Sequence, residues 1–228
     1  MEPASCEVWW AETAWLRPWH TGILSDEERA RCARLGTAHC KVAAALLRLV
    51  AARHTPWPAA LIAVDRTCPR CGRQHGRPRI PNSDLHVSIS HAGGRVAVAA
   101  CRAAAVGVDI EPVIDITADE LAPLAIATDE VPYAVDARAV LTYWTRKEAV
   151  VKATGDGVEV PLSEVRVTPP GTAPRLLGYP GRDGLAAQLV DLHPGDAYVG
   201  ALAVLTPGPV EVREVSAEGL LTAPGADR

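Results

Sequence analysis

The sequence predicts an α+β protein built of two similar lobes. Strand-like stretches alternate with a few strong helical stretches, and the strand–turn–strand pattern of residues 86–101 returns near residues 188–205. The chain has 228 residues, of which 48% are hydrophobic, so it is long enough for one large domain or for two lobes of about 100 residues each. We expect an N-terminal lobe over residues 1–105 and a C-terminal lobe over residues 106–228.

The composition excludes several classes of protein. A chain with 48% hydrophobic and 22% charged residues is neither disordered nor collagen-like. No window approaches the ~18 consecutive apolar residues of a membrane helix, and Met1–Ser5 lacks the basic start of a signal peptide. We therefore expect a cytoplasmic protein with no membrane partner. The net charge of −4 and the pI near 6.0 argue against general binding to nucleic acid, so an anionic ligand needs a local basic cluster.

The N-terminal half begins with an aromatic-rich stretch around residues 8–19, which predicts a strand followed by a loop. Ser25 and Glu28 have the spacing of a capping box, which predicts a helix from there to about Leu35. A second helix is expected from about Thr37 to Arg53, before two prolines. A loop rich in cysteine, proline, glycine and arginine is expected over residues 66–82.

The rest of the chain predicts further strands and one long helix. Alternating or apolar patterns predict strands over residues 86–90, 95–101 and 106–111. Residues 115–139 predict short helices, and a strong helix is expected over residues 137–153. Strands are expected over residues 164–168, 185–192 and 197–205. The last residues, from about residue 207, predict a strand remnant and a loose tail.

Two carboxylates lie on the strand over residues 106–111. Residues two apart share one face of a strand, so Asp109 and Glu111 are expected to point together while Val108 and Ile110 point into the core. Paired carboxylates suit a hard cation such as Mg²⁺, which takes oxygen ligands. The alternative is an acidic strand face exposed to solvent.

The helix over residues 137–153 carries a second polar group. Steps of four residues place Trp144, Glu148 and Lys152 on one face. A surface Glu–Lys pair is the alternative, but only three of the 23 basic residues in the chain are lysines, and two of them, Lys147 and Lys152, lie here. The use of lysine here, in a chain that mostly uses arginine, indicates that a compact ammonium group is needed on this helix. Trp144 is expected to be a packing anchor.

Together these two segments resemble the paired signature of 4′-phosphopantetheinyl transferases. The resemblance rests on Gly107–Glu111, which reads GVDIE, and Trp144–Ala153, which reads WTRKEAVVKA. Ser88–His91 and Gly76–Pro78 are similar to two further motifs of the larger, Sfp-type branch. The resemblance covers about residues 25–155 and implies a monomer of two similar lobes related by a pseudo-twofold axis.

The resemblance implies an activity. Such enzymes transfer the 4′-phosphopantetheine arm of coenzyme A to a serine of an apo acyl or peptidyl carrier protein and release 3′,5′-ADP. Asp109, Glu111 and Glu148 would hold Mg²⁺, with Mn²⁺ as an alternative, and Glu148 and Lys152 would be catalytic. The carrier could serve fatty-acid, polyketide or non-ribosomal-peptide synthesis. We expect coenzyme A and the carrier as partners, and no nucleic acid.

The coenzyme-binding residues follow from the same resemblance. The residues implied to contact coenzyme A are Arg31, His39, Arg77, Ser90, His91, Asp109 and Lys152. The sequence departs from the family upstream of these motifs. Glu28 stands where a basic residue is common, and His39 lies near a position where relatives often have arginine.

The cysteines offer one further motif. Cys68, Cys71 and His75 have knuckle-like spacing and supply three ligands for a structural Zn²⁺, with a fourth expected from Cys32, Cys40 or His54. The alternative is a reduced, turn-rich loop that only delivers Arg77. In a cytoplasmic chain all six cysteines are expected to be thiols or metal ligands rather than disulfides, with Cys6 and Cys101 in the core.

A different class of function competes with the transferase. The loop over residues 66–79 contains five arginines, so a zinc-knuckle module that binds RNA or DNA is the alternative. The net negative charge and the absence of aromatic residues in that loop oppose it. It also leaves the two carboxylate-bearing segments unexplained.

Overall fold

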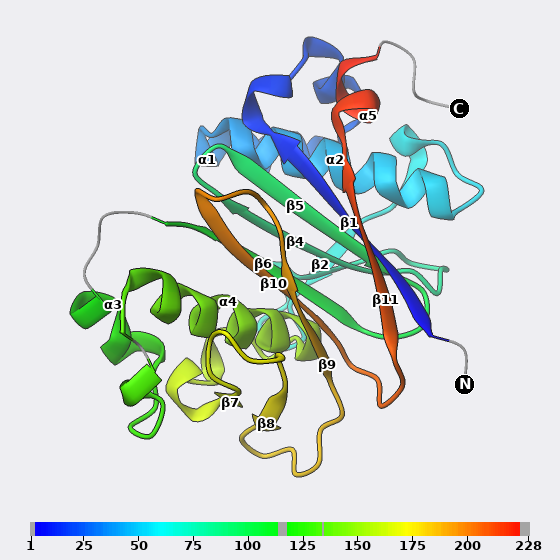
Figure 1. Cartoon of the computed structure of the whole chain (residues 1–228). Coiled ribbons are helices and arrows are strands. Elements are labelled where there is room, and N and C mark those ends of the chain that lie inside the picture. Colours follow the sequence, from blue (N-terminus) through cyan, green and yellow to red (C-terminus); the bar gives the residue numbers. More distant parts are fainter. Residues whose placement is uncertain (1–2, 114–117, 134, 224–228) are drawn as a thin grey trace.

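Two β-sheets pack face to face, and a helix covers the outer face of each sheet (Figure 1). This arrangement comes from a computed structural model that describes residues 3–113, 118–133 and 135–223. A mixed α/β architecture is confirmed, whereas the relation of the two lobes by a pseudo-twofold axis stays a prediction.

The larger sheet has six strands in the order β11-β1-β5-β4-β3-β2. Its strands are β1 (Ala4–Glu12), β2 (Asp65–Thr67), β3 (Gln74–Arg79), β4 (His86–Ala92), β5 (Arg95–Cys101) and β11 (Val210–Ser216). The second sheet has the order β6-β10-β9, and β7 pairs with β8. These strands are β6 (Val106–Pro112), β7 (Arg166–Val167), β8 (Leu176–Gly178), β9 (Gln188–Leu192) and β10 (Tyr198–Val204).

Five α-helices complete the described chain, together with short 3₁₀ segments. They are α1 (Asp26–Leu35), α2 (Ala38–His54), α3 (Ala118–Ala125), α4 (Ala137–Thr154) and α5 (Glu218–Thr222). The two long helices predicted near residues 37–53 and 137–153 are therefore confirmed. Within the described residues no helix is long and apolar enough to cross a membrane.

Strand alternation explains how one sheet packs on two sides. Trp9 and Ala11 of β1 face the core beneath α2, whereas Val8 and Trp10 face the second sheet. The opposite face of that second sheet meets α4, as Figure 1 shows for β6 and β10. The six-stranded sheet is thus buried on both faces in its middle, which accounts for its apolar strands.

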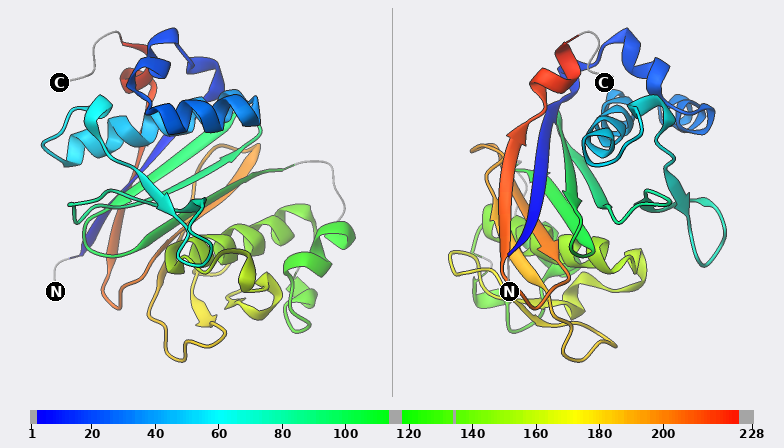
Figure 2. Two further views of the ribbon diagram at one scale, coloured as in Figure 1. Left: turned by 180° about the vertical axis from the view of Figure 1, so that it is seen from behind. Right: turned by 90° about the vertical axis from the view of Figure 1, so that its right-hand side faces the viewer.

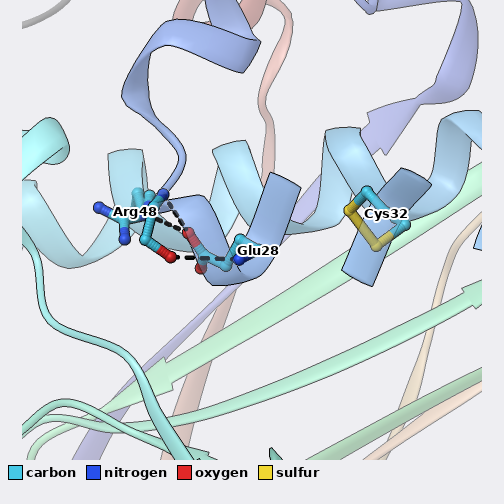
Figure 3. Close-up of a disulfide and its surroundings, with 5 residues drawn as sticks. Glu28, Cys32 and Arg48 are labelled. Atoms are coloured by element: carbon cyan, nitrogen blue, oxygen red, sulfur yellow. Dashed lines mark hydrogen bonds and ion pairs between the residues drawn. A yellow bond between two sulfur atoms is a disulfide. The ribbon is translucent and has the colours of Figure 1, made fainter. Parts of the chain in front are cut away.

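The first helix is fixed at its start and along its side. The Ser25 hydroxyl accepts from the Glu28 backbone N–H at 3.2 Å and the Glu28 carboxylate accepts from the Ser25 N–H at 3.0 Å, so the predicted capping box is confirmed. The same carboxylate forms a buried ion pair of 2.7 Å with Arg48 of α2 (Figure 3). Glu28 therefore stabilises the α1–α2 pair, which explains an acidic residue at this position.

The cysteine prediction is wrong for one pair. Cys32 of α1 and Cys40 of α2 form a disulfide, drawn with Cys32 labelled in Figure 3, instead of two free thiols. The turn between the helices brings their Cα atoms to 5.3 Å, within the usual range for a disulfide. Cys6 and Cys101 are buried thiols in register on β1 and β5, as predicted.

Two other segments differ from the sequence prediction. The expected loop over residues 66–82 contains β2 and β3, which pair at the edge of the large sheet. The strand remnant expected beyond about residue 207 is confirmed as β11, which pairs in parallel with β1, whereas the expected loose tail is wrong for Glu218–Thr222, which form α5. The side view of Figure 2 shows β11 and β1 next to each other. A strand from the second predicted lobe thus completes the sheet of the first.

The predicted short helices between residues 115 and 139 are represented by α3 and by a 3₁₀ turn over Val131–Tyr133. The parts of this prediction that fall on residues 115–117 and 134 lie outside the described residues. The same holds for the end of the predicted tail, residues 224–228.

Gly107 permits an unusually close approach of β6 to α4. A Cβ at this position would lie 2.0 Å from the Ala149 carbonyl oxygen and 2.5 Å from the Ala153 backbone nitrogen. Both atoms belong to the helix backbone and cannot rotate away. Ala201 and Ala203 of β10 are also small and fully buried beneath the helix. The packing of α4 on this sheet therefore requires residues with little or no side chain.

Replacing Gly107 by alanine is expected to lower the free energy of unfolding by about 3 kcal/mol or more, because the methyl group has no room. Urea denaturation measures this loss. Gly219→Ala is the matched control, since no atom lies within 4 Å of the added methyl and the position is helical. A Gly107→Ala chain as stable as the control would contradict the close approach.

His20 links the N-terminal loop to the last helix. Its Nδ1 accepts from the Arg17 backbone N–H at 2.9 Å, and its Nε2 lies 3.1 Å from the Leu221 carbonyl oxygen. A carbonyl only accepts, so Nε2 carries the proton and the ring is neutral. Burial lowers the pKa of His20, because charging a fully buried imidazole loses hydration and also loses the bond from Arg17.

Stability is expected to fall as the pH drops below about 6.5, because the unfolded chain then binds a proton that folded His20 resists. His20→Gln removes this contribution and makes the decrease shallower between about pH 7 and about pH 5.5. Urea denaturation at several pH values tests this, with the exposed His193→Gln as control. An unchanged slope in His20→Gln would refute the assignment.

Candidate functional site

A cavity of about 270 Å³ opens between β4, β6 and α4. Its walls bring together residues that are far apart in sequence. It is lined by Ile89, Ser90, His91, Asp109, Glu111, Trp144, Glu148 and Lys152. Six of the residues proposed from the sequence as site residues thus surround a single space. Trp144, which was expected to be only a packing anchor, also lines it.

Asp109 lies at the centre of the polar network in this cavity. The Ser90 hydroxyl donates to its Oδ1 at 2.8 Å, and the Lys152 ammonium donates to the same oxygen and to Ser90. Asp109 is only 2% exposed, so the alternative of an acidic face in solvent is wrong for this residue. Its second oxygen, Oδ2, is buried and has no hydrogen-bond partner in the described part of the chain. A buried carboxylate oxygen without a donor is a ready acceptor for a ligand.

Two further carboxylates face the same cavity. Burial, followed by repulsion from Asp109, raises the pKa of Glu111 to about 7. Burial and the same neighbour also raise the pKa of Glu148. Lys152 opposes both shifts, yet it is the only cationic side chain among the lining residues apart from the histidine. The site therefore has more negative than positive groups and favours a cation.

The chemistry of these donors fits a hard divalent cation. Asp109, Glu111 and Glu148 offer carboxylate oxygens from two rigid elements, and one of those oxygens has no partner among the residues that the structure describes. The three carboxylates do not form a compact cluster on their own: in the described part of the chain, the compact group of potential ligands is Cys68, Cys71 and His75. A cation at the carboxylates would leave coordination positions for other oxygen ligands.

A histidine pair borders the cavity. His91 lines it, and the ring of His39 from α2 stacks on His91 with centroids 5.3 Å apart. The Nε2 of His39 contacts the Gly93 carbonyl oxygen in the β4–β5 turn. Burial lowers the pKa of His91, with contributions from His39 and Lys152. His39, which lies near a position where relatives often have arginine, is thus close to the site.

Two residues proposed for coenzyme binding do not line this cavity. Arg77 of β3 donates at 2.8 Å to the carbonyl oxygen of Ala153, at the C-terminal end of α4. Arg31 lies in a separate hollow beside Arg66, whose pKa is lowered to about 10 by burial and by repulsion from Arg31. In this structure Arg77 supports the helix that carries Glu148, and Arg31 belongs to a different basic group.

Several residues that hold the strand and the helix of the site in place were not predicted from the sequence. The Ser88 hydroxyl accepts from the Val108 backbone N–H at 3.1 Å and joins β4 to β6. Lys147 is fully buried and contacts Glu130, so it holds α4 to the preceding segment instead of entering the cavity. Arg146 binds Asp191 through two hydrogen bonds of 2.8 and 2.6 Å. Only Gly107 had a sequence signal, because a glycine inside a strand marks a close approach.

The Asp109–Lys152 pair gives a stability prediction. Lys152→Met leaves a buried carboxylate beside two others, and we expect it to lower the free energy of unfolding by about 1–3 kcal/mol, because the lysine side chain is partly exposed. Adding Asp109→Asn should recover part of this loss. Denaturation of the four chains of this double-mutant cycle gives the coupling energy. Purely additive effects would show that the two groups do not interact.

The sequence agrees with the chemistry of this cavity. Residues 105–203 match the family model of the 4′-phosphopantetheinyl transferase superfamily. The matched segment includes β6, α4, β9 and β10, and so supplies both the strand and the helix that bear the three carboxylates. No curated protein matches the chain. The match covers less than half of the 228-residue chain.

Proposed function

We propose that this chain transfers the 4′-phosphopantetheine arm of coenzyme A to a serine of an apo acyl or peptidyl carrier protein, as an enzyme of the Sfp-type branch. The observation that carries the proposal is the placement of three carboxylates and Lys152 around one cavity, within the segment that matches the superfamily. The motifs at Gly76–Pro78 and Ser88–His91 support the branch. We expect the enzyme to act as a monomer.

Lys152 and the neighbouring polar groups would bind the phosphates of coenzyme A. The Lys152 ammonium lies on the wall of the cavity and is partly exposed, so a pyrophosphate oxygen can approach it. His91, supported by His39, and the Ser90 hydroxyl border the same space. These groups supply hydrogen-bond donors that orient the pyrophosphate next to the carboxylates.

Asp109, Glu111 and Glu148 would hold Mg²⁺ or Mn²⁺, which would neutralise the charge that develops on the pyrophosphate when its bond breaks. Oδ2 of Asp109 is the atom that most requires such a partner, because it is buried without one. Lys152 would share this charge from the opposite side of Asp109.

Glu148 is the group we assign as the general base. Its carboxylate lines the cavity beside Asp109 and Lys152, so it is available to a hydroxyl group that enters this space. The carrier serine oxygen would form a bond to the phosphorus that bears pantetheine. The bond from that phosphorus to the bridging oxygen breaks, the electron pair leaves with 3′,5′-ADP, and the serine proton passes to Glu148.

The intact mass of apo carrier proteins after incubation with this chain, coenzyme A and Mg²⁺ tests the proposed function. We expect each modified carrier to gain about 340 Da, the mass of the phosphopantetheine arm. The gain should be absent when EDTA is present during the incubation, because the reaction needs a divalent ion. Fatty-acid, polyketide and peptide carriers run side by side would identify the preferred class. Folded enzyme that modifies none of them, and that does not bind coenzyme A, would refute the proposal.

Substitutions in the same assay test the individual roles. Asp109→Asn and Glu148→Gln are each expected to lower the transfer rate by about 100-fold or more, because each removes a charge needed in the transition state. Asp183→Asn, a surface change outside the cavity, is the matched control and should keep the full rate. Near-normal turnover in folded Asp109→Asn or Glu148→Gln would remove that residue from the mechanism.

A further inference from the structure

The hairpin between β2 and β3 carries a cluster that the proposed reaction does not use. Cys68, Cys71 and His75 each offer one potential ligand atom, and these three atoms lie within 4.8 Å of one another. The Cys71 Sγ is 3.0 Å from the His75 Nε2. The cluster lies at the exposed tip of the hairpin, so neither burial in the core nor the cavity near α4 explains it.

The backbone of this hairpin forms a tight turn that contains both cysteines. The Gly72 N–H donates to the Cys68 carbonyl oxygen at 2.9 Å, and the Cys68 N–H donates to the Arg73 carbonyl oxygen at 2.8 Å. Gly72 has a φ of +69°, a conformation that favours glycine. This turn keeps Cys68 and Cys71 at the same tip of the hairpin as His75, within reach of one ion.

A second glycine brings His75 back towards the cysteines. A Cβ on Gly76 would lie 3.0 Å from the carbonyl oxygens of Arg66 and Thr67 and 3.1 Å from the Cys68 Cα. The two strands can therefore approach closely directly after His75. The convergence of the three ligands thus depends on the backbone and does not rest on side-chain rotation alone.

We propose that Cys68, Cys71 and His75 bind one Zn²⁺. Two sulfur ligands and one imidazole suit zinc better than Mg²⁺ or Ca²⁺, which prefer oxygen. Zinc in proteins is usually four-coordinate. Among the described residues, no histidine, cysteine or carboxylate supplies a fourth ligand to this group. A solvent molecule would occupy the fourth position.

The fourth ligands considered from the sequence are engaged elsewhere. Cys32 and Cys40 are joined in a disulfide, which removes both thiolates. The Nε2 of His54 lies 3.2 Å from the carboxylate of Glu7 in β1, which β5 and β4 separate from the β2–β3 hairpin. The site therefore differs from the closed four-ligand centre that the spacing alone suggested.

The ion would have a structural role next to the candidate active site. Arg70, between the two cysteines, forms an ion pair with Glu159, which follows α4. Arg77, two residues after His75, holds the Ala153 carbonyl oxygen at 2.8 Å. A metal at the tip would fix the hairpin that makes both contacts, and so would stabilise the end of the helix that bears Lys152.

The metal content of the 228-residue chain tests the site independently of transfer activity. After incubation with Zn²⁺ and removal of free metal, about one zinc per chain is expected for the three-ligand set, and Co²⁺ in its place should give a visible absorption band from cysteine-bound tetrahedral cobalt. Cys68→Ser, Cys71→Ser and His75→Ala should each weaken binding by more than about tenfold. His193→Ala is the matched control for the histidine and should bind normally.

A second variant tests whether the bound zinc depends on any other cysteines. The Cys32→Ser/Cys40→Ser chain removes the disulfide-bonded cysteine pair and should still bind one zinc. Amide exchange of residues 66–79 should slow when zinc is added, whereas the same exchange in Cys71→Ser should not change. The proposal is overturned by zinc that persists in Cys68→Ser/Cys71→Ser, or by a Cys68–Cys71 disulfide whose reduced form takes up no metal.

Discussion

The close approach of β6 to α4 at Gly107 is the constraint on which the candidate site depends. The space for this approach exists because Gly107 has no side chain and because Ala149 and Ala153 are the helix residues that face it. Asp109 and Glu111 follow on the same face of the strand, and Glu148 and Lys152 lie beside those alanines on the helix. A larger residue at position 107 would separate the two groups of charges.

The same site shows a conflict between stability and ligand binding. Three carboxylates share one cavity with a single lysine, and burial raises the pKa of two of them. Such a group of like charges destabilises the fold, and the structure compensates with contacts behind the site. Ser88 joins β4 to β6, while the buried Arg146 and Lys147 anchor α4 to Asp191 and Glu130. An excess of negative charge in a cavity between a rigidly held strand and helix suits a cation, and the cation in turn can bind a phosphate ligand.

Local patterns predicted what depends on neighbours in sequence. Period-two alternation placed Asp109 and Glu111 on one face, and the capping box placed the start of α1. Contacts between distant segments could not be predicted in this way. The partner of Arg77 is a carbonyl group 76 residues away, and β11 gains its strand conformation by pairing with β1 at the other end of the chain. The Cys32–Cys40 disulfide depends on the angle of a helix–helix turn that the spacing does not reveal.

The most direct test of this account is a crystal structure of the chain with coenzyme A and Mg²⁺. The account predicts the pyrophosphate within hydrogen-bond distance of the Lys152 ammonium, and a metal ion whose ligands include the Asp109 Oδ2 atom that has no partner in the structure described here. Coenzyme A bound elsewhere, for example in the larger hollow beside α1 and Lys41, with the cavity between β6 and α4 empty, would contradict it.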